Sequence, residues 1–534
     1  MAYLNFVLHA HLPFVRHPEH ARFLEEEWLY EAMTETYIPL LLEFEALEKD
    51  GLPFRITMSL TPPLCEMLAD ELLQTRYAHH LGRLRELAEK ECSRVKNDAR
   101  FAPLAAMYRN RFEACHLKFE ALGRNLLNGF RHYQRRGNLE ILTCGATHGF
   151  LPNLRHSPRA VEAQLAIAVR NHEKHFGVAP QGIWLGECGY YPGLDAHLRD
   201  AGLRYFFADT HAILQGEPPS PKGCYAPVET PAGVFCFARD PESSKAVWSA
   251  EEGYPGDWRY REFYRDIGFD LDFDYIKPYI HPMGLRTQTG IKYHRITGKN
   301  VEKEPYVEAW ALEAARDHAA NFVYNRDLQA AWLDPKMAAM PGGAPANIIC
   351  PYDAELFGHW WYEGPRFLGA VMREALTGSH RVALASPRDY LDRHHGIPPA
   401  QPAFSSWGAG GYADVWLNGT NDWIYPHLHK LAERMNETAN LPERGERKDR
   451  GSLDARARNQ MARELLLAQS SDWAFIMKTG TMVEYAVRRT KVHVHNGFAL
   501  ADQIAAGRID EGFLHNLEMT NTIFPEIDYR VYNG

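Results

Sequence analysis

The sequence predicts an α/β protein with a largely parallel, barrel-like sheet, followed by a helical C-terminal region. Seven short apolar runs, rich in β-branched and aromatic residues, each precede a loop and a helical pattern. Near-continuous apolar strands between helices are typical of a parallel sheet buried on both faces. Seven such units favour a barrel over an open sheet, although periodicity alone does not prove closure. At roughly 100–200 residues per domain, the 534-residue chain accommodates two to four domains, or one large barrel with additions.

The strand pattern is interrupted in two places. The predicted strands are residues 3–8, 54–59, 139–144, 182–185, 203–208, 234–238 and 347–352. Residues 70–127 have apolar positions at helical spacing, which predicts a helical insertion between the second and third strands. Beyond residue 402 the strand signals end. The predicted elements there are helices at residues 421–435, 453–469 and 480–488, with a charged linker at 442–450.

These patterns divide the chain into three predicted units. They are a barrel of residues 1–69 and 128–401, a helical insertion of residues 70–127, and a C-terminal helical domain of residues 402–534. Residues 216–223 contain three prolines, which predicts an exposed loop. Residues 240–254 also lack a regular pattern, and we expect the two segments together to cover a site.

Charge and cysteine usage exclude several classes of partner. Lysine and arginine number 59 against 68 acidic residues, a formal net charge of −9, so the basic footprint of a nucleic-acid-binding protein is absent. No apolar run reaches the length of about 18 residues that predicts a membrane span.

The N-terminus lacks a basic region and a cleavage site, so we interpret it as a first strand and not a signal peptide. Eight scattered cysteines without a C-x-x-C pair indicate reduced, mostly buried thiols in a cytoplasmic protein. Nothing marks a subunit interface, so a monomer is the default expectation.

Polar, titratable residues follow four of the predicted strands. In a β/α barrel the active site lies at the carboxyl ends of the strands. The first strand ends in H-A-H-L-P, where His9 and His11, two residues apart, point to one face. The third is followed by G-A-T-H-G-F-L-P with His148, the fourth by W-L-G-E-C-G-Y with Glu187, and the last by Y-D-A-E-L-F-G-H-W-W with Asp353. Any one of these is commonly a loop or capping residue, but four strand ends at one mouth predict an active site.

The residue types at this mouth fit two kinds of chemistry. Two carboxylates on different strands, Glu187 and Asp353, are the usual groups for cleaving a glycosidic bond. One must attack as an anion, and the other must hold a proton near neutral pH in an environment that raises its pKa. The alternative is a zinc or manganese site, in which three histidines and a carboxylate are the ligands. The sequence contains no phosphate-binding P-loop, no G-x-S-x-G elbow and no H-E-x-x-H helix.

Across nearly its whole length the chain resembles glycoside hydrolase family 57, and within it the enzymes that branch α-glucans. Four blocks carry the resemblance: H-A-H-L-P, G-A-T-H, W-L-G-E-C-G-Y and Y-D-A-E-L-F-G-H-W-W. The resemblance implies an incomplete (β/α)7 barrel with a helical insertion and an all-helical C-terminal domain. It also implies that the chain cleaves α-1,4 bonds of amylose or glycogen and makes α-1,6 branches, without a cofactor or metal.

The resemblance further implies roles for individual residues. Glu187 would be the nucleophile and Asp353 the general acid/base. Trp407 and Trp416 would complete the acceptor groove. Trp is frequent in relatives where this chain has Phe269, and T-G-Q where it has T-G-T at residues 479–481. The predicted substrate-binding residues are His9, His11, His148, a loop tyrosine assigned to Tyr225, an arginine that is either Arg261 or Arg265, Phe269, Trp360, Trp407, Trp416 and Asp472.

Two alternatives stay open at this point. The first is a hydrolase similar to α-amylase, or a 4-α-glucanotransferase, of the same family, because these enzymes need the same two carboxylates. The second, from a different class, is a non-catalytic glucan-binding protein. Such a protein would be expected to lose a carboxylate, and both Glu187 and Asp353 are present.

Overall fold

The computed structural model describes residues 1–298, 301–340, 342–443 and 451–534, so most of the predicted charged linker lies outside it. One curved sheet has the strand order β6-β7-β5-β4-β3-β2-β1-β8, with β9 pairing to β1. Every strand pair is parallel except β6–β7. Its strands are β1 (Ala2–Ala10), β2 (Ile56–Leu60), β3 (Leu139–Cys144), β4 (Gly182–Trp184), β5 (Tyr205–Ala208), β6 (Val228–Glu229), β7 (Phe235–Ala238), β8 (Asn347–Asp353) and β9 (Val382–Leu384).

The sheet is an open, curled half-barrel, which confirms the predicted incomplete barrel. Its path begins at β6 and ends at β8, and these two strands are not paired with each other in the described part of the chain. All seven predicted strands are present. The two that sequence reasoning missed, β6 and β9, have two and three residues and are too short to show a period.

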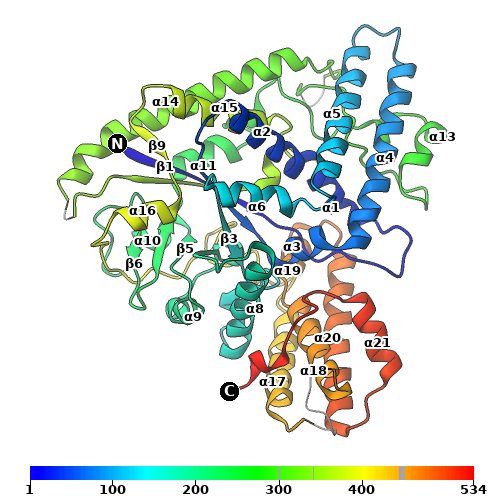
Figure 1. The fold of residues 1–534 in the computed structure, drawn as a ribbon, viewed down its shortest axis with the longest axis vertical. Helices are drawn as coiled ribbons and strands as arrows, with labels where there is room; N and C mark the ends of the chain where they lie inside the picture. The colour runs from blue at the N-terminus through cyan, green and yellow to red at the C-terminus, as the bar shows by residue number, and fades with distance from the viewer. Residues whose placement is uncertain (299–300, 341, 444–450) are drawn as a thin grey trace.

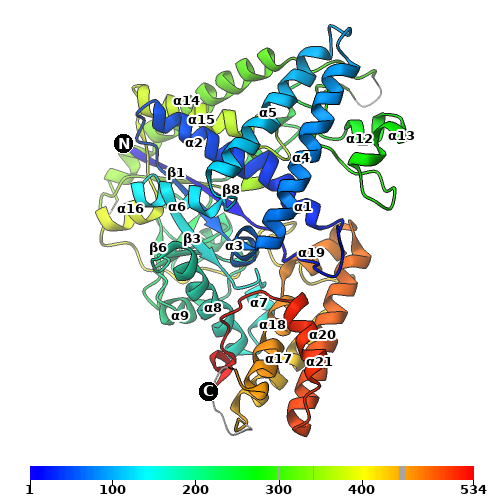
Figure 2. The ribbon, with the colours of Figure 1, turned by 45° about the vertical axis from the view of Figure 1, so that its right-hand side comes forward.

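Helices cover the sheet on both faces (Figures 1 and 2). Between α1 and α2 the chain forms a π-helix, Met33–Tyr37, a rare element that is frequent at functional sites. The main helices around the sheet are α1 (Glu26–Ala32), α2 (Ile38–Lys49), α3 (Pro62–Ala69), α6 (Leu127–Arg136), α8 (Pro158–Phe176), α9 (Leu194–Asp200), α10 (Thr210–Leu214), α14 (Glu308–Ala338), α15 (Gly364–Thr377) and α16 (Pro387–Arg393).

Two long helices, α4 (Glu71–Arg94) and α5 (Ala102–Ala121), lie between β2 and β3. Asp70 starts α4 by accepting a hydrogen bond from the Leu73 backbone N–H at 2.9 Å, which satisfies one otherwise unpaired donor of the first turn. The buried face of α4 then repeats at four- and three-residue spacing, as in Leu73, Tyr77 and His80. The pair projects from the sheet at the top of Figure 1.

The C-terminal region is helical and lies at the opposite end of the molecule from the α4–α5 tip (Figure 1). Its helices are α17 (Ile424–Asn440), α18 (Leu453–Ala468), α19 (Ser471–Thr479), α20 (Val483–Ala506) and α21 (Glu511–Thr520). Among the residues that the structure describes, none beyond β9 forms a strand. The exact domain boundaries stay a prediction.

One local expectation is wrong. Residues 240–254 lack a periodic signal, yet Pro241–Trp248 forms α11. Asp240 accepts a hydrogen bond from the Ser243 backbone N–H at 2.7 Å, and Pro241 takes the first helical position, where proline lacks only a donor that would be unpaired anyway. Capping therefore makes a helix that is too short to show amphipathic periodicity.

All eight cysteines are free thiols in the structure, and seven of them are buried, as expected. Among the described helices, none combines the length and the apolar character that crossing a bilayer requires.

Candidate active site

Glu187 and Asp353 lie at the carboxyl ends of β4 and β8, as the strand-end argument predicts. Asp353 is the last residue of β8, where it pairs in register with His9 of β1. Glu187 follows β4 in a single 3₁₀ turn, Gly186–Cys188. Three strands separate β4 from β8 in the sheet. Its curl nonetheless brings the two carboxyls close enough for the charge of Asp353 to raise the pKa of Glu187.

The backbone that carries Glu187 is strained. Glu187 has φ 57° and ψ 27°, and Cys188 has φ 51°, both in the left-handed region that non-glycine residues rarely occupy. Such conformations cost about 1–3 kcal/mol each and persist where surrounding contacts hold them. One such contact comes from the far end of the chain, because the Trp407 backbone N–H donates to the Glu187 carbonyl at 2.8 Å. Gly186 is required here, since a Cβ would lie 2.8 Å from the carbonyl oxygen of Gly149.

A short hydrogen-bonded series leads from His9 to Glu187. His9 Nε2 lies 2.9 Å from His148 Nε2, and His148 Nδ1 lies 2.7 Å from the Ser471 hydroxyl. Ser471 Oγ donates to Glu187 Oε1 over a long 3.5 Å. The network assigns the proton of His9 to Nε2 and that of His148 to Nδ1. With these tautomers, each group in the series donates its hydrogen bond toward Glu187.

Both imidazoles in this series are neutral near pH 7. Burial lowers the pKa of His9 and of His148 well below the usual range, and the charge of His11 adds to both shifts. The rings form a stack, with His11 and His148 centroids 3.8 Å apart at 11° and His9 over Trp184 at 4.7 Å.

His11 is held between two elements and pairs with Asp472. Its Nδ1 lies 3.0 Å from the Thr61 hydroxyl, and its Nε2 lies 3.0 Å from Asp472 Oδ2. Burial alone would raise the pKa of Asp472, but the charge and hydrogen bond of His11 outweigh it and lower that pKa to about 2. Asp472 is therefore an anion at any working pH. The C-terminal helix α19 thus brings a fixed negative charge into the mouth.

Burial raises the pKa of both candidate carboxyls, Asp353 and Glu187. That of Asp353 rises to about 7, with the nearby His11 charge opposing the shift in part. That of Glu187 rises well above its usual range through burial and then through repulsion from Asp353 and Asp472. Because the two carboxyls repel each other, they titrate as a pair, and one proton stays in the site after the first has left. A site that keeps one carboxylate and one carboxylic acid near neutral pH suits acid-assisted displacement at a glycosidic carbon.

One group of three potential metal ligands occurs among the described residues: His11, His148 and Asp472, whose ligand atoms lie within 4.8 Å of one another. His9, which the metal alternative also required, is not part of it. The stacked His11 and His148 rings are nearly parallel, so their in-plane lone pairs run side by side. A tetrahedral zinc site needs lone pairs that converge. The geometry therefore favours a hydrogen-bonded cluster over a metal centre.

The two tryptophans predicted to complete an acceptor groove differ in burial, because Trp407 is partly exposed and Trp416 is not. Its ring meets Trp184 edge-on at 4.9 Å and 87°, and the Arg239 guanidinium lies 5.3 Å from its centroid. Trp248, the last residue of α11, contacts it at 6.1 Å and is partly exposed. Trp416 is only 1% exposed and stacks on Phe150 at 5.1 Å, so it presents no face to a sugar.

The assignment of Tyr225 as the loop tyrosine near the catalytic centre is wrong. The Asn347 backbone N–H donates to the Tyr225 carbonyl at 2.8 Å, which places Tyr225 at the start of β8. Asp353 ends the same strand six residues on, about 20 Å away at the usual rise per residue. The Tyr225 hydroxyl instead accepts a hydrogen bond from Gln329 of α14. Sequence proximity to a loop did not distinguish the two ends of the strand.

The predicted arginines occupy different environments. Arg261 is 4% exposed, with its guanidinium over the Tyr362 ring at 4.1 Å, so it cannot reach a sugar without rearrangement. Arg265 is on the surface, in an ion pair with Asp270 at 3.0 Å. Phe269 is 48% exposed, but no contact joins it or Arg265 to either catalytic carboxyl in the described chain. Trp360 is 55% exposed and stacks on Phe263 at 4.6 Å, which leaves one face free.

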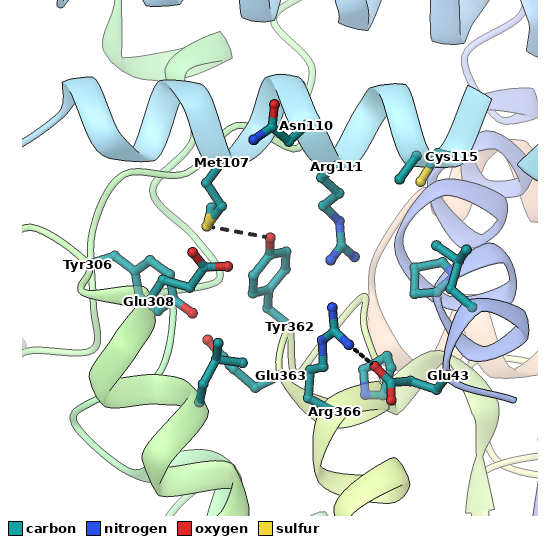
Figure 3. A pocket seen from close by; sticks show the side chains of 15 residues that line it. Glu43, Met107, Asn110, Arg111, Cys115, Tyr306, Glu308, Tyr362, Glu363 and Arg366 are labelled. Atoms are coloured by element: carbon teal, nitrogen blue, oxygen red, sulfur yellow. Dashed lines mark hydrogen bonds and ion pairs between the residues drawn. The ribbon is translucent and has the colours of Figure 1, made fainter. Parts of the chain in front are cut away.

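A cavity of about 300 Å³ lies between α2, α5, α14 and α15 (Figure 3). The Tyr362 ring stands at its centre, and Arg111 reaches down from α5 to within 4.3 Å of the ring centroid. Neither Glu187 nor Asp353 lines it. This cavity is therefore separate from the catalytic mouth.

Sequence reasoning missed several residues that hold the site together. Ser471 adjoins the predicted Asp472, so its position in S-S-D-W was the available signal. Glu355 lies two residues after Asp353 and accepts hydrogen bonds from the Tyr37 hydroxyl and, at 3.3 Å, from the His11 backbone N–H. No sequence signal pointed to Tyr37, because it lies in a helix far from the strand ends.

Comparison with known families gives two matches. A family model described as Glycosyl hydrolase family 57 matches residues 5–397, and one described as 1,4-alpha-glucan branching enzyme, C-terminal, matches residues 427–532. The "1,4-alpha-glucan branching enzyme TK1436" of Thermococcus kodakarensis is 33% identical over 98% of this chain and 77% of its own length. A "Probable 1,4-alpha-glucan branching enzyme" of Mycobacterium tuberculosis is 31% identical over 95% of this chain and 93% of its own length.

Solved structures extend the likeness to the whole fold. The "novel alpha-amylase AmyC from Thermotoga maritima" superimposes with a TM-score of 0.91 and 48% identity over 99% of each chain. The branching enzyme TK1436, crystallised with glucose, gives a TM-score of 0.88 and 32% identity over 100% of this chain and 96% of that one. Both structures are similar to the entire chain, including its C-terminal helices.

Proposed function

The chain belongs to glycosyl hydrolase family 57, and from that premise we propose that it is a 1,4-α-glucan branching enzyme. One observation carries this proposal. The C-terminal region that matches the branching-enzyme model also builds the mouth, because Ser471 and Asp472 of α19 contact Glu187 and His11. These contacts support the proposal that the region is part of the catalytic centre.

In the first half of the proposed reaction, an α-1,4-glucan lies across the mouth. Asp353, as the carboxylic acid, protonates the departing glycosidic oxygen, while the Glu187 carboxylate attacks the anomeric carbon. The bond to the leaving chain breaks as the bond to Glu187 Oε forms, which gives a covalent glucosyl-enzyme. In enzymes that follow this retaining route, the two carboxyls lie roughly 5–5.5 Å apart. The raised pKa of Asp353, about 7, leaves the acid protonated in much of the protein near neutral pH.

In the second half, a glucan 6-hydroxyl replaces the leaving chain. The Asp353 carboxylate removes the hydroxyl proton, the oxygen attacks the anomeric carbon, and Glu187 departs as a carboxylate. Transfer in place of hydrolysis requires the acceptor to compete with water at a covered site. The Trp407 backbone contacts Glu187, and the Trp248 ring meets the Trp407 ring edge-on at 6.1 Å, so the two offer rings on which acceptor sugars can stack.

Hydrolysis of the same α-1,4 bonds is the second candidate. It is favoured by the 48% identity to a protein named an α-amylase, against 32% to a branching-enzyme structure. Both functions need the same carboxyls, so the balance depends on how well the acceptor excludes water. The free thiols fit a reducing compartment. We therefore place the enzyme in the cytoplasm, acting on a glycogen-like polymer.

Incubation with amylose, followed by proton NMR and a reducing-end assay, tests the proposal. New α-1,6 signals without a matching rise in reducing ends are expected. Rising reducing ends without α-1,6 signals would establish the hydrolase instead. A parallel reaction with a chelator should show undiminished activity, and loss of activity that zinc restores would revive the metal alternative.

A further inference from the structure

The loop that follows Asp353 is clamped by the π-helix Met33–Tyr37 at three points. Glu35 Oε2 lies 2.7 Å from His359 Nδ1, and the Tyr37 hydroxyl donates to Glu355. At the third point Gly358 packs directly on the helix backbone, because a Cβ there would lie 1.9 Å from the Glu35 carbonyl oxygen. Gly358 also has φ 121°, a conformation that other residues avoid.

The π-helix is what brings these contacts into register. An α-helix places successive side chains about 100° apart, whereas the extra residue of a π turn shifts the following face around the axis. Met33–Tyr37 is buried throughout, and the Glu35 and Tyr37 side chains both contact the turn that follows β8. The rare element therefore faces the segment that carries the acid.

Glu355 joins this clamp to the catalytic mouth. Its Oε1 accepts from the Tyr37 hydroxyl on one side and from the His11 backbone N–H, at 3.3 Å, on the other. Asp353, two residues earlier, has no hydrogen bond from its carboxyl to the protein within the described chain, so its position depends on the turn that follows it. Burial raises the pKa of both Glu355 and Tyr37, and the charge of the neighbouring Asp353 adds to each shift.

We propose that Tyr37 and Glu355 form a positioning pair that holds the Asp353 turn in its reactive place, with the π-helix Met33–Tyr37 as its support. This inference rests on the proposed role of Asp353 as the proton donor. Neither residue has to touch the glucan. Their part is to keep the free carboxyl of Asp353 aimed at the glycosidic oxygen, where a misplacement of about 1 Å costs on the order of 100-fold in rate.

Three variants test the pair. Tyr37→Phe removes one hydrogen bond and keeps the ring. Glu355→Gln keeps an oxygen that accepts from Tyr37 and His11, and Glu355→Ala removes it. The matched control is Tyr205→Phe. It removes another buried tyrosine hydroxyl that donates to a glutamate, Glu140, at the amino end of β3. Each variant is assayed for total α-1,4 bond turnover on amylose, with kcat and KM across pH 5–9, and for its Tm.

We expect Tyr37→Phe and Glu355→Ala to lower kcat about 10- to 100-fold with KM nearly unchanged. Glu355→Gln should recover most of the activity, because it restores both hydrogen bonds. The basic limb of kcat/KM should keep its place in Tyr37→Phe while the whole profile falls. Tyr205→Phe should lower Tm by about as much as Tyr37→Phe does, and it should leave kcat unchanged.

Two results would overturn the inference while the proposed function stands. The first is that the wild-type enzyme is active and both Tyr37→Phe and Glu355→Ala keep its kcat. The other is a Glu355→Gln variant as inactive as Glu355→Ala, which would make Glu355 act through its proton and not through position. A wild-type protein that neither cleaves nor branches amylose would instead overturn the proposed function, and this inference with it.

Discussion

Glu187 and Asp353 face one mouth, but different parts of the chain support them. Glu187 sits on strained backbone, and two hydrogen bonds reach it from beyond residue 402, through the Trp407 backbone and the Ser471 hydroxyl. Asp353 ends a regular strand, and its following turn is clamped by a helix from the first 40 residues. The proposed nucleophile thus depends on the C-terminal region, and the proposed acid depends on the half-barrel itself. Substitutions can therefore disturb the Glu187 side of the mouth and the Asp353 side, here called its two corners, separately.

Removing either carboxyl gives the largest effect and tests whether the two corners have different jobs. Glu187→Ala and Asp353→Ala should each lower turnover of amylose by at least about 10³-fold. With a substrate whose aryl leaving group needs no acid, Asp353→Ala should still form the glucosyl-enzyme, and Glu187→Ala should not. Mass spectrometry of quenched reactions measures the covalent adduct. An adduct in Glu187→Ala would reverse the assignment.

Two neighbouring residues of the C-terminal region should move the acidic limb of kcat/KM in opposite directions. The Asp472 charge raises the pKa of Glu187, so Asp472→Asn should lower that pKa and shift the limb to lower pH. The Ser471 hydrogen bond lowers the same pKa, so Ser471→Ala should shift the limb to higher pH. Rates should fall roughly 10-fold or more in each case. Stopped assays across pH 4–8 measure the acidic limb in both variants. Shifts in the same direction would contradict the contact of these two residues with Glu187.

The acid corner should also show in protein stability. The folded-state pKa of Asp353 is about 7, above its unfolded value of about 3.9, so the folded protein holds this proton longer than the unfolded chain. The contribution to the free energy of unfolding is therefore largest at acidic pH and is lost as pH rises through about 7. Asp353→Asn should raise Tm at pH 8 relative to wild type, and much less at pH 4. Equal shifts at both pH values would contradict the raised pKa.

The smallest expected effects compare the two tryptophans. Trp407→Ala should lower transfer more than hydrolysis, because it removes a ring from the acceptor side of Glu187. Trp416→Phe should leave that ratio within about twofold and reduce stability by roughly 1–3 kcal/mol, the usual range for a buried ring reduced in size. NMR of the products and urea denaturation measure the two quantities. An unchanged transfer ratio in Trp407→Ala would show that this ring only packs against Trp184.

The fold and the placement of the two candidate carboxyls were predictable because each rests on a local pattern. Strands buried on both faces show as apolar runs, and polar residues just after them stand at the mouth, as Glu187 and Asp353 do. Contacts between distant elements leave no such pattern. Tyr37 reaches Glu355 across more than 300 positions through a π turn that no periodicity announces. Trp416 shares its Gly-rich setting with Trp407, yet packing buries one and leaves the other beside Glu187.

The bond from the Trp407 backbone to the Glu187 carbonyl has a consequence for how the protein is made. A ribosome that has completed the half-barrel has already produced both carboxyls, but Trp407, Ser471 and Asp472 are still untranslated. The strained turn at Glu187 then lacks the contacts that hold it in place. We therefore expect activity toward glucan to arise late in synthesis, after the last helices have docked, and a chain that ends before Trp407 to leave the polymer untouched.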